Sequence, residues 1–297
     1  MKILTDDFPS FASFMTSSKG LEWTKASHPA RKSSMPQAPS FRDGMDRLVR
    51  HYHRQATLRG ERPFNELIND PRWFSSLVES LNVRITRVLC DDFPLQNLRD
   101  ALENVDECVV KPVRSYSSRG VMSLRREGEL SFFCLQQRCV LRLVNILDQL
   151  NAAMRGHQIA NHWRLEELLL PPSGLCRPVD DYKFYAIGGQ VGLILQVCRL
   201  EDGQKYRWYD RDWQPVPTGK YDDQLDHTLL PPRKPEQLSR VARQLSEALP
   251  APFCRIDLYE TSHGVVLGEL TPVPGTYHTL GADADLYLGA MLEAVWH

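Results

Sequence analysis

Residues 253–275 read FCRIDLYETSHGVVLGELTPVPG, and this stretch decides the fold. Residues alternate in character over 255–259 and again over 268–271, a period typical of β-strands, which predicts strands at 253–259 and 265–270. Ser262-His263-Gly264 separates the two runs, and a short turn of this kind joins antiparallel neighbours. The stretch therefore predicts an antiparallel pair of strands that ends in a rigid, proline-containing turn.

This strand pairing would bring two carboxylates close together. Asp257 and Glu269 would lie on one face of adjacent strands. Two carboxylates in that arrangement repel unless a cation lies between them, and Mg²⁺ typically takes one or two carboxylates together with phosphate oxygens. Arg255 points to the same side as Asp257 and could either pair with it or stabilise a transferring phosphoryl group.

A second charged face belongs to residues 181–187, DYKFYAI. Asp181, Lys183 and Tyr185 alternate with apolar neighbours and so share one face of a strand. Gly188-Gly189 joins this strand to the next, residues 190–199, as a hairpin. The charged face either lines a cleft or is an ordinary solvated sheet face.

A third feature is the strand 107–111 with its following loop, residues 115–120, SYSSRG. Lys111 at the end of a buried strand offers a point charge suited to phosphate. Small residues and Gly120 would let backbone N–H groups approach an anion, although a loop of this composition is also typical of a plain turn. The Walker A spacing is absent.

The fourth feature is LEELLL, residues 165–170. Consecutive glutamates inside an apolar strand place Glu166 and Glu167 on opposite faces. One can be solvated, whereas the other needs a hydrogen-bond donor if it is buried. An adenine amino group would supply such a donor.

The remaining pattern predicts an α+β protein with largely antiparallel sheets. Further helices are expected at 45–59, 74–81, 138–154, 235–249 and 283–296, and further strands at 84–89, 121–126, 130–134 and 205–210. Residues 1–40 are rich in Ser, Pro and Lys, which is typical of an irregular arm.

Composition bounds the function classes. The hydrophobic fraction of 42% and charged fraction of 25% are ordinary for a globular protein. A formal net charge of −1 predicts no general attraction to nucleic acid or to an anionic membrane. The sequence has no apolar run long enough to span a bilayer and no signal-peptide pattern at its start, so a cytoplasmic protein is expected. The 7 cysteines lack CxxC spacing and are expected to be reduced thiols.

Taken in order, these segments resemble the ATP-grasp superfamily, and most closely its TupA-like group, which is associated with teichuronopeptide and other surface-polymer biosynthesis. The resemblance extends from about residue 69 to the C-terminus. It implies an ATP-grasp fold with two α+β subdomains whose antiparallel sheets clasp a nucleotide. The expected division is an N-terminal arm and helical region at 1–70, a small subdomain with the phosphate-covering loop at 71–165, and a large subdomain with the metal site at 166–297.

The resemblance also implies roles for individual residues. Arg255 and Lys183 would be catalytic, and Asp257, Glu269 and Thr271 would hold Mg²⁺. ATP would be bound by Lys111, Ser115, Ser117, Ser118, Gly120, Glu166, Glu167, Leu168, Asp181 and Lys183. Thr271 stands where many ATP-grasp ligases have asparagine, and Arg72 stands near the position of an upstream lysine.

The expected activity is an ADP-forming ligase that activates a carboxylate as an acyl phosphate and joins it to an amine. The substrates would be small molecules such as a sugar acid, an amino acid or a peptide, in surface-polysaccharide or natural-product biosynthesis. Two other classes stay open: a small-molecule or sugar kinase on the same fold, and a non-catalytic nucleotide-binding scaffold. A homodimer is also left open.

Overall fold

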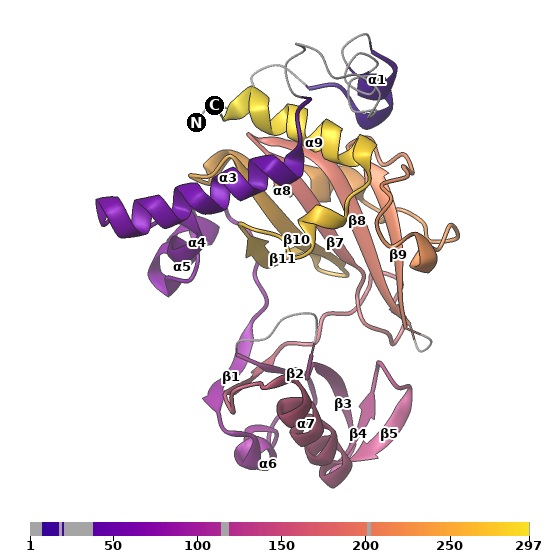
Figure 1. The fold of residues 1–297 in the computed structure, drawn as a ribbon. Coiled ribbons are helices and arrows are strands. Elements are labelled where there is room, and N and C mark those ends of the chain that lie inside the picture. Colours follow the sequence, from indigo (N-terminus) through magenta and orange to yellow (C-terminus); the bar gives the residue numbers. More distant parts are fainter. Residues whose placement is uncertain (1–7, 18–19, 21–37, 114–118, 201–202, 297) are drawn as a thin grey trace.

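The computed structural model describes residues 8–17, 20, 38–113, 119–200 and 203–296. In this part of the chain the strands form one six-stranded and one five-stranded sheet, whose ladders are antiparallel. Figure 1 shows one sheet above the other, each with helices of its own. The predicted α+β class with two antiparallel sheets is confirmed.

The five-stranded sheet has the strand order β11-β10-β7-β8-β9. Its strands are β7 (Asp181–Ile187), β8 (Gln190–Leu200), β9 (Gly203–Asp210), β10 (Phe253–Thr261) and β11 (Gly264–Thr271). The β7–β8 hairpin turns at Gly188 and Gly189, whose φ angles are +56° and +87°. Glycine adopts such angles without steric cost, and the hairpin predicted at this dipeptide is confirmed.

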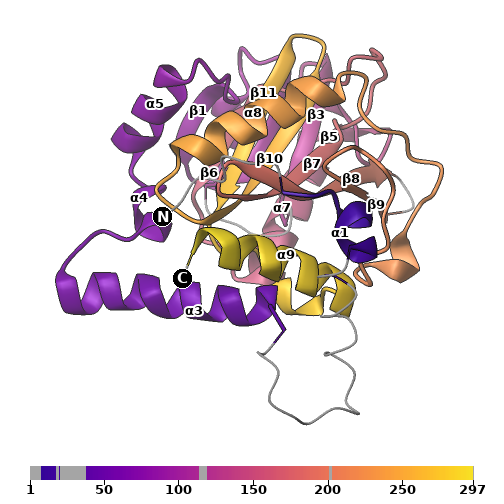
Figure 2. The same ribbon diagram turned by 90° about the horizontal axis from the view of Figure 1, so that it is seen from above.

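Helices cover both faces of this sheet. Helix α8 (Pro235–Ala248) lies on one side, and α9 (Ala282–Val295) and α3 (Phe41–Arg54) lie on the other, as the view from above in Figure 2 shows. The short helix α1 (Phe11–Thr16) packs against α9. A Cβ on Gly289 would lie only 2.6 Å from the backbone of Ser40, so glycine permits α3 to begin directly against α9.

The N-terminal helical region continues from α3 into a π-helical turn, η1 (Gln55–Arg59), then α4 (Phe64–Leu67) and α5 (Pro71–Ser80). Asp70 caps α5 by accepting the Arg72 N–H at 2.9 Å, as the Asp-Pro pair predicts. Trp73 and Leu77 of α5 pack against the core of the five-stranded sheet. By packing, α5 therefore belongs with the larger core, although the predicted small subdomain starts at residue 71.

The six-stranded sheet has a separate core. Its order is β1-β6-β2-β3-β4-β5. Its strands are β1 (Val88–Phe93), β2 (Glu107–Pro112), β3 (Met122–Gly128), β4 (Ser131–Cys134), β5 (Cys139–Arg142) and β6 (Trp163–Glu166). One face packs on α7 (Leu143–His157), on α6 (Leu98–Ala101) and on the 3₁₀ turn η2 (Leu95–Asn97), and the side chains of this core include Trp163, Leu165 and Ile146.

Several predicted element boundaries were wrong. The helix predicted at 45–59, for example, begins at Phe41 as α3. The helix predicted at 138–154 begins only at Leu143, because residues 139–142 pair with β4 as an edge strand. The strand predicted at 84–89 begins only at Val88, as β1. Arg84 is not part of it, because its carbonyl accepts the N–H of Leu267 in β11. The strand predicted at 165–170 ends at Glu166, because Leu169 leaves the sheet to pack against Val266.

The rest of the described chain consists of connections and two 3₁₀ turns, η3 (Asp222–Gln224) and η4 (Tyr277–Thr279). None of the helices that the structure describes has the length and apolar character needed to cross a membrane. The seven cysteines are free thiols.

Candidate functional site

The pairing of β10 with its two neighbours aligns the charged residues in rows. Asp257 lies directly opposite Glu269 of β11 on one side and Lys183 of β7 on the other. Arg255 lies opposite Thr271 and Tyr185 in the adjacent row. Residues opposite one another share a face, so the predicted alignment of Asp257 with Glu269 is confirmed.

Asp257 is enclosed by two cations. Its Oδ1 lies 2.7 Å from Nε of Arg255, and its Oδ2 lies 2.8 Å from Nη2 of the same guanidinium. The Lys183 ammonium also contacts Oδ2. Only 2% of the Asp257 side chain is exposed. A bidentate arginine fixes the carboxylate plane, so Asp257 is held in one orientation.

Lys183 links Asp257 to Asp181, whose Oδ2 lies 2.7 Å from the ammonium and 3.2 Å from Nη2 of Arg199. Burial by itself lowers the pKa of Lys183, but Asp181 and Asp257 outweigh burial and raise it. For the acid Asp181 the signs are reversed: burial raises the pKa of Asp181, but Lys183 and Arg199 outweigh burial and lower it. Lys183 and Asp181 are therefore both ionised at neutral pH. Oδ1 of Asp181 is buried and has no hydrogen-bond partner among the residues that the structure describes.

Glu269 differs from Asp257 because 59% of its side chain is exposed. The Thr271 hydroxyl donates to its Oε1 at 3.0 Å, and Nη2 of Arg255 lies 3.4 Å from its Oε2. Within the described ranges, no group of three or more His, Cys, Asp or Glu residues is arranged to hold a metal ion. The donors present are thus two carboxylates and one hydroxyl, which fit a cation that takes its other ligands from phosphate and water.

The six-stranded sheet contributes a second charged group, on the face opposite its core. Lys111 of β2 lies across from Arg164 of β6. Nζ of Lys111 is 2.8 Å from Oε2 of Glu166, and Nη1 of Arg164 is 3.7 Å from Oε1. The Glu166 carboxylate is largely buried, with 8% of the residue exposed. This arrangement presents cations and an acceptor together, which suits a nucleotide base and phosphate.

Glu167 is the first residue after β6, and its contacts differ from those of Glu166. Its Oε2 lies 2.8 Å from Nη2 of Arg84, and its Oε1 accepts the backbone N–H of Arg87 at 3.0 Å. These contacts tie the connection after β6 to the connection before β1. A cavity of about 400 Å³ adjoins this side and is lined in part by Glu167, Leu168 and His263. Asp257 and Lys183 do not line this cavity.

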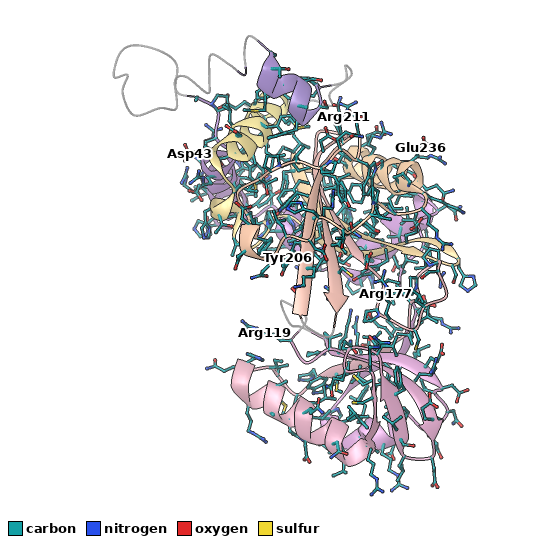
Figure 3. The ribbon with its side chains drawn as sticks, turned by 90° about the vertical axis from the view of Figure 1, so that its right-hand side faces the viewer. Asp43, Arg119, Arg177, Tyr206, Arg211 and Glu236 are labelled. Atoms are coloured by element: carbon teal, nitrogen blue, oxygen red, sulfur yellow. The ribbon has the colours of Figure 1, made fainter. Side chains whose placement is uncertain are left out.

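The loop after β2 is described only in part. Ser115, Ser117 and Ser118 lie outside the described residues. Gly120 has a φ of +71°, and a Cβ there would lie 3.1 Å from Trp163 and 3.3 Å from Pro112. Glycine thus lets the loop return to β3 closely over the end of β2. Figure 3 shows Arg119 on the smaller subdomain and Tyr206 on β9 at opposite sides of the space between the two sheets.

Sequence reasoning missed three cations of these clusters. Arg199 was detectable, because the β7–β8 hairpin register places it beside Asp181. Arg164 was detectable from alternation with Glu166. Lys220 was not, because it lies in a connection without periodicity, yet only 3% of it is exposed and the positive charge of Arg255 acts on it.

No curated protein sequence matches the chain significantly. Among solved structures, the D-alanine–D-alanine ligase from Helicobacter pylori matches at 18% identity over 77% of this chain and 59% of that chain, with a TM-score of 0.40. The D-alanine–D-alanine ligase from Bacillus anthracis matches at 12% identity over 79% and 69%, with a TM-score of 0.45. The ATP-grasp ligase PsnB, complexed with a phosphomimetic variant of its minimal precursor, Mg and ADP, matches at 14% identity over 86% and 71%, with a TM-score of 0.40.

The chain thus spans less than two thirds of the length of the H. pylori enzyme. A protein-family model is more decisive, because the model described as TupA-like ATPgrasp matches residues 89–293 without interruption. That range contains the whole five-stranded sheet, all but the first residue of the six-stranded sheet, and the charged groups around Asp257 and Glu166. The resemblance and the ATP-grasp fold predicted from the sequence are confirmed, and the chain belongs to the TupA-like ATP-grasp family.

Proposed function

We propose that this chain is an ATP- and Mg²⁺-dependent ligase that activates a carboxylate as an acyl phosphate and joins it to an amine. The observation that carries the proposal is the row formed by Glu269, Asp257 and Lys183, with Arg255 holding Asp257 from the next row. Such a cluster supplies fixed charges for a phosphoryl group and leaves no need for a protein nucleophile.

Each cation has a role in this proposal. Lys111 binds the nucleotide phosphates from the six-stranded sheet, and Lys183 meets the terminal phosphate from the five-stranded sheet. Arg255 neutralises the acyl phosphate and the tetrahedral species that follows it. Glu166 accepts from the adenine amino group, and the Leu168 backbone lies at the ring. Because ion pairs already hold the Lys111, Lys183 and Arg255 side chains in position, these side chains need little reorganisation when the nucleotide binds.

The chemistry requires two displacements. A substrate carboxylate oxygen first bonds to the γ-phosphorus, and the bond to the bridging oxygen of ADP breaks. The amine nitrogen then bonds to the acyl carbon, phosphate leaves with the carboxylate oxygen, and the amine loses a proton to solvent. Arg255 and Lys183 offset the negative charge that gathers in both steps.

Asp257 and Glu269 would hold Mg²⁺, and Thr271 would orient Glu269 through its hydroxyl. When bound, the ion would offset negative charge on the phosphate oxygens. The donor set fits, since Glu269 is exposed and, within the described residues, its two oxygens and Oδ1 of Asp257 each accept a single hydrogen bond.

The substrate pair remains to be found by experiment. Purified protein with Mg-ATP should be screened for ADP release against acids and amines supplied singly and together, with sugar acids, amino acids and short peptides as the first classes. ADP release that requires both partners would support the ligase. A stable phosphorylated hydroxyl would support a kinase instead. The absence of any Mg-ATP-dependent rise in melting temperature would contradict both activities and favour a scaffold.

A further inference from the structure

Lys220 is a buried cation with no carboxylate partner in the part of the chain that the structure describes. It lies in the connection after β9, with 3% of the residue exposed. Its ammonium donates to the carbonyl and hydroxyl oxygens of Thr276, at 2.9 and 3.0 Å. Burying an ammonium without a counter-charge is costly, whereas Lys183 and Arg255 of the same region each have carboxylate partners.

The position of Lys220 is fixed by contacts on every side. Its carbonyl accepts from the indole N–H of Trp208 at 3.1 Å. Thr218 accepts the N–H of Gly281 at 2.7 Å. A Cβ on Gly219, whose φ is +69°, would lie 2.9 Å from the Gly281 backbone. The connection after β9 and the connection before α9 therefore pack tightly against each other, and this packing fixes the backbone position of Lys220.

This position adjoins the charged cluster. Across the sheet, the register runs from Trp208 to Leu195, to Lys183 and to Asp257. The backbone carbonyl of Lys220 contacts Trp208, at one end of that row. The segment that follows β11 contacts the Lys220 ammonium through Thr276. The charged and titratable groups that face Lys220 are Arg255 of β10 and Tyr221, whose ring centroid lies 5.2 Å from Nζ. The Tyr206 ring stacks on Tyr221, with the two ring centroids 4.2 Å apart.

Two further features of the same segments are otherwise unexplained. Tyr221 and Thr276 both adopt left-handed backbone, with φ of +64° and +55°, which is strained for residues with a Cβ and concentrates at functional positions. In the described part of the chain, the Thr218 hydroxyl is buried without a hydrogen-bond partner. Burial, then the charge of Arg255, lowers the pKa of Lys220 to about 8. An anion bound here would relieve this cost.

We propose that Lys220 binds the carboxylate of the acid substrate beside Arg255, with the Tyr221 ring as one wall of the subsite. This inference rests on the proposed ligase function and deepens it, because it names a carboxylate-binding lysine and predicts that an uncharged analogue is rejected. Before the substrate carboxylate is phosphorylated, its negative charge compensates the positive charge of Lys220.

The test measures binding, so it does not need turnover. Calorimetric titration of Mg-ADP-saturated protein should use D-glucuronate, D-alanine and the dipeptide Ala-Ala, each compared with its carboxamide. At least one acid should bind about tenfold more tightly than its amide. Lys220→Met should lose that preference while keeping its affinity for Mg-ADP, and Lys220→Arg should retain it. Unchanged acid affinity in Lys220→Met, or no binding of any acid, would overturn the proposal.

Two further readouts exclude a purely structural role. Acid affinity should fall about tenfold per pH unit above pH 8 in the wild type and stay constant there in Lys220→Arg. The melting temperature of Lys220→Met should equal or exceed that of the wild type; a fall of more than about 4 °C would assign Lys220 to clamping Thr276 instead. Lys234→Met, at an exposed lysine, is the matched control and should change neither readout. If the wild type fails to bind Mg-ADP, the proposed function itself is wrong, irrespective of Lys220.

Discussion

Asp257 and Glu269 lie directly opposite each other on β10 and β11, yet their side chains are 2% and 59% exposed. The first is held between Arg255 and Lys183, and the second is held only by a threonine hydroxyl and a long contact to Arg255. The pair therefore combines a fixed charge with an accessible one. Substitutions at the two positions should have different consequences for stability, although both should abolish turnover.

Glu269→Gln should lower Mg-ATP-dependent ADP release at least about a hundredfold, since one of two negative ligands is lost. It should leave the melting temperature within about 1 °C, because exposed ion pairs contribute little to stability. Parallel assays of ADP release and thermal unfolding check both statements. Wild-type ADP release in this variant would remove Glu269 from the metal site.

Asp257→Asn should abolish ADP release and also destabilise the fold, by about 3 kcal/mol. The physical reason is that Arg255 loses its bidentate partner and Lys183 keeps only Asp181, so buried positive charge is left uncompensated. Urea unfolding of the variant beside Glu269→Gln measures the contrast. Equal stability of the two variants would contradict the difference in burial as the deciding factor.

Arg255→Ala should retain Mg-ATP binding but form no product, because its proposed charge neutralisation is needed only once the phosphoryl group transfers. Fluorescence or calorimetric titration with Mg-AMPPNP should give an affinity within about threefold of the wild type. Arg255→Lys should recover part of the stability but little product, since an ammonium cannot replace the bidentate contact. Product formation at the wild-type rate in Arg255→Ala would exclude the proposed role.

The sequence predicted the parts of this site that depend on strand alternation. Asp257, Glu269 and Arg255 could be placed on one face because period and turn position together fix an antiparallel register. Lys183 could not be added to that face, because β7 and β10 are distant in the sequence and pair only in the folded chain. Helix boundaries such as Leu143 were missed, because an edge strand pairing with β4 replaced the first helical turn. Lys220 could not be found, since its surroundings come from connections that meet only in the folded chain.

Glu166→Gln should weaken Mg-ATP binding about tenfold, because the nucleotide loses a charged acceptor and Lys111 loses its partner. Glu167→Gln is the matched control at the next residue. It breaks the contact to Arg84 and should lower the melting temperature slightly while leaving nucleotide affinity unchanged. Equal losses of affinity in the two variants would mean that the effect comes from the connection after β6 and not from an adenine contact.

Gly268 provides the last prediction, because the β10–β11 ladder is irregular there. Asp257 pairs with Glu269, but Leu258 pairs with Leu267, so Gly268 is the extra residue of a bulge. A Cβ at Gly268 would lie 2.5 Å from Cε2 of Tyr259, whose pKa is raised by burial and then by Asp181. Gly268→Ala must therefore displace the Tyr259 ring or the bulge beside Glu269.

The expected cost of Gly268→Ala is about 1–3 kcal/mol, as for other overpacked sites, with a parallel loss of ADP release. Gly156→Ala in α7 is the matched control, because a Cβ there meets nothing within 4 Å. Alanine should stabilise that helix by about 0.5–1 kcal/mol and leave ADP release unchanged. Urea unfolding and ADP release on both variants separate the cases. Wild-type stability in Gly268→Ala would show that the Tyr259 ring moves aside at no cost in free energy. The bulge would then not fix the position of Glu269.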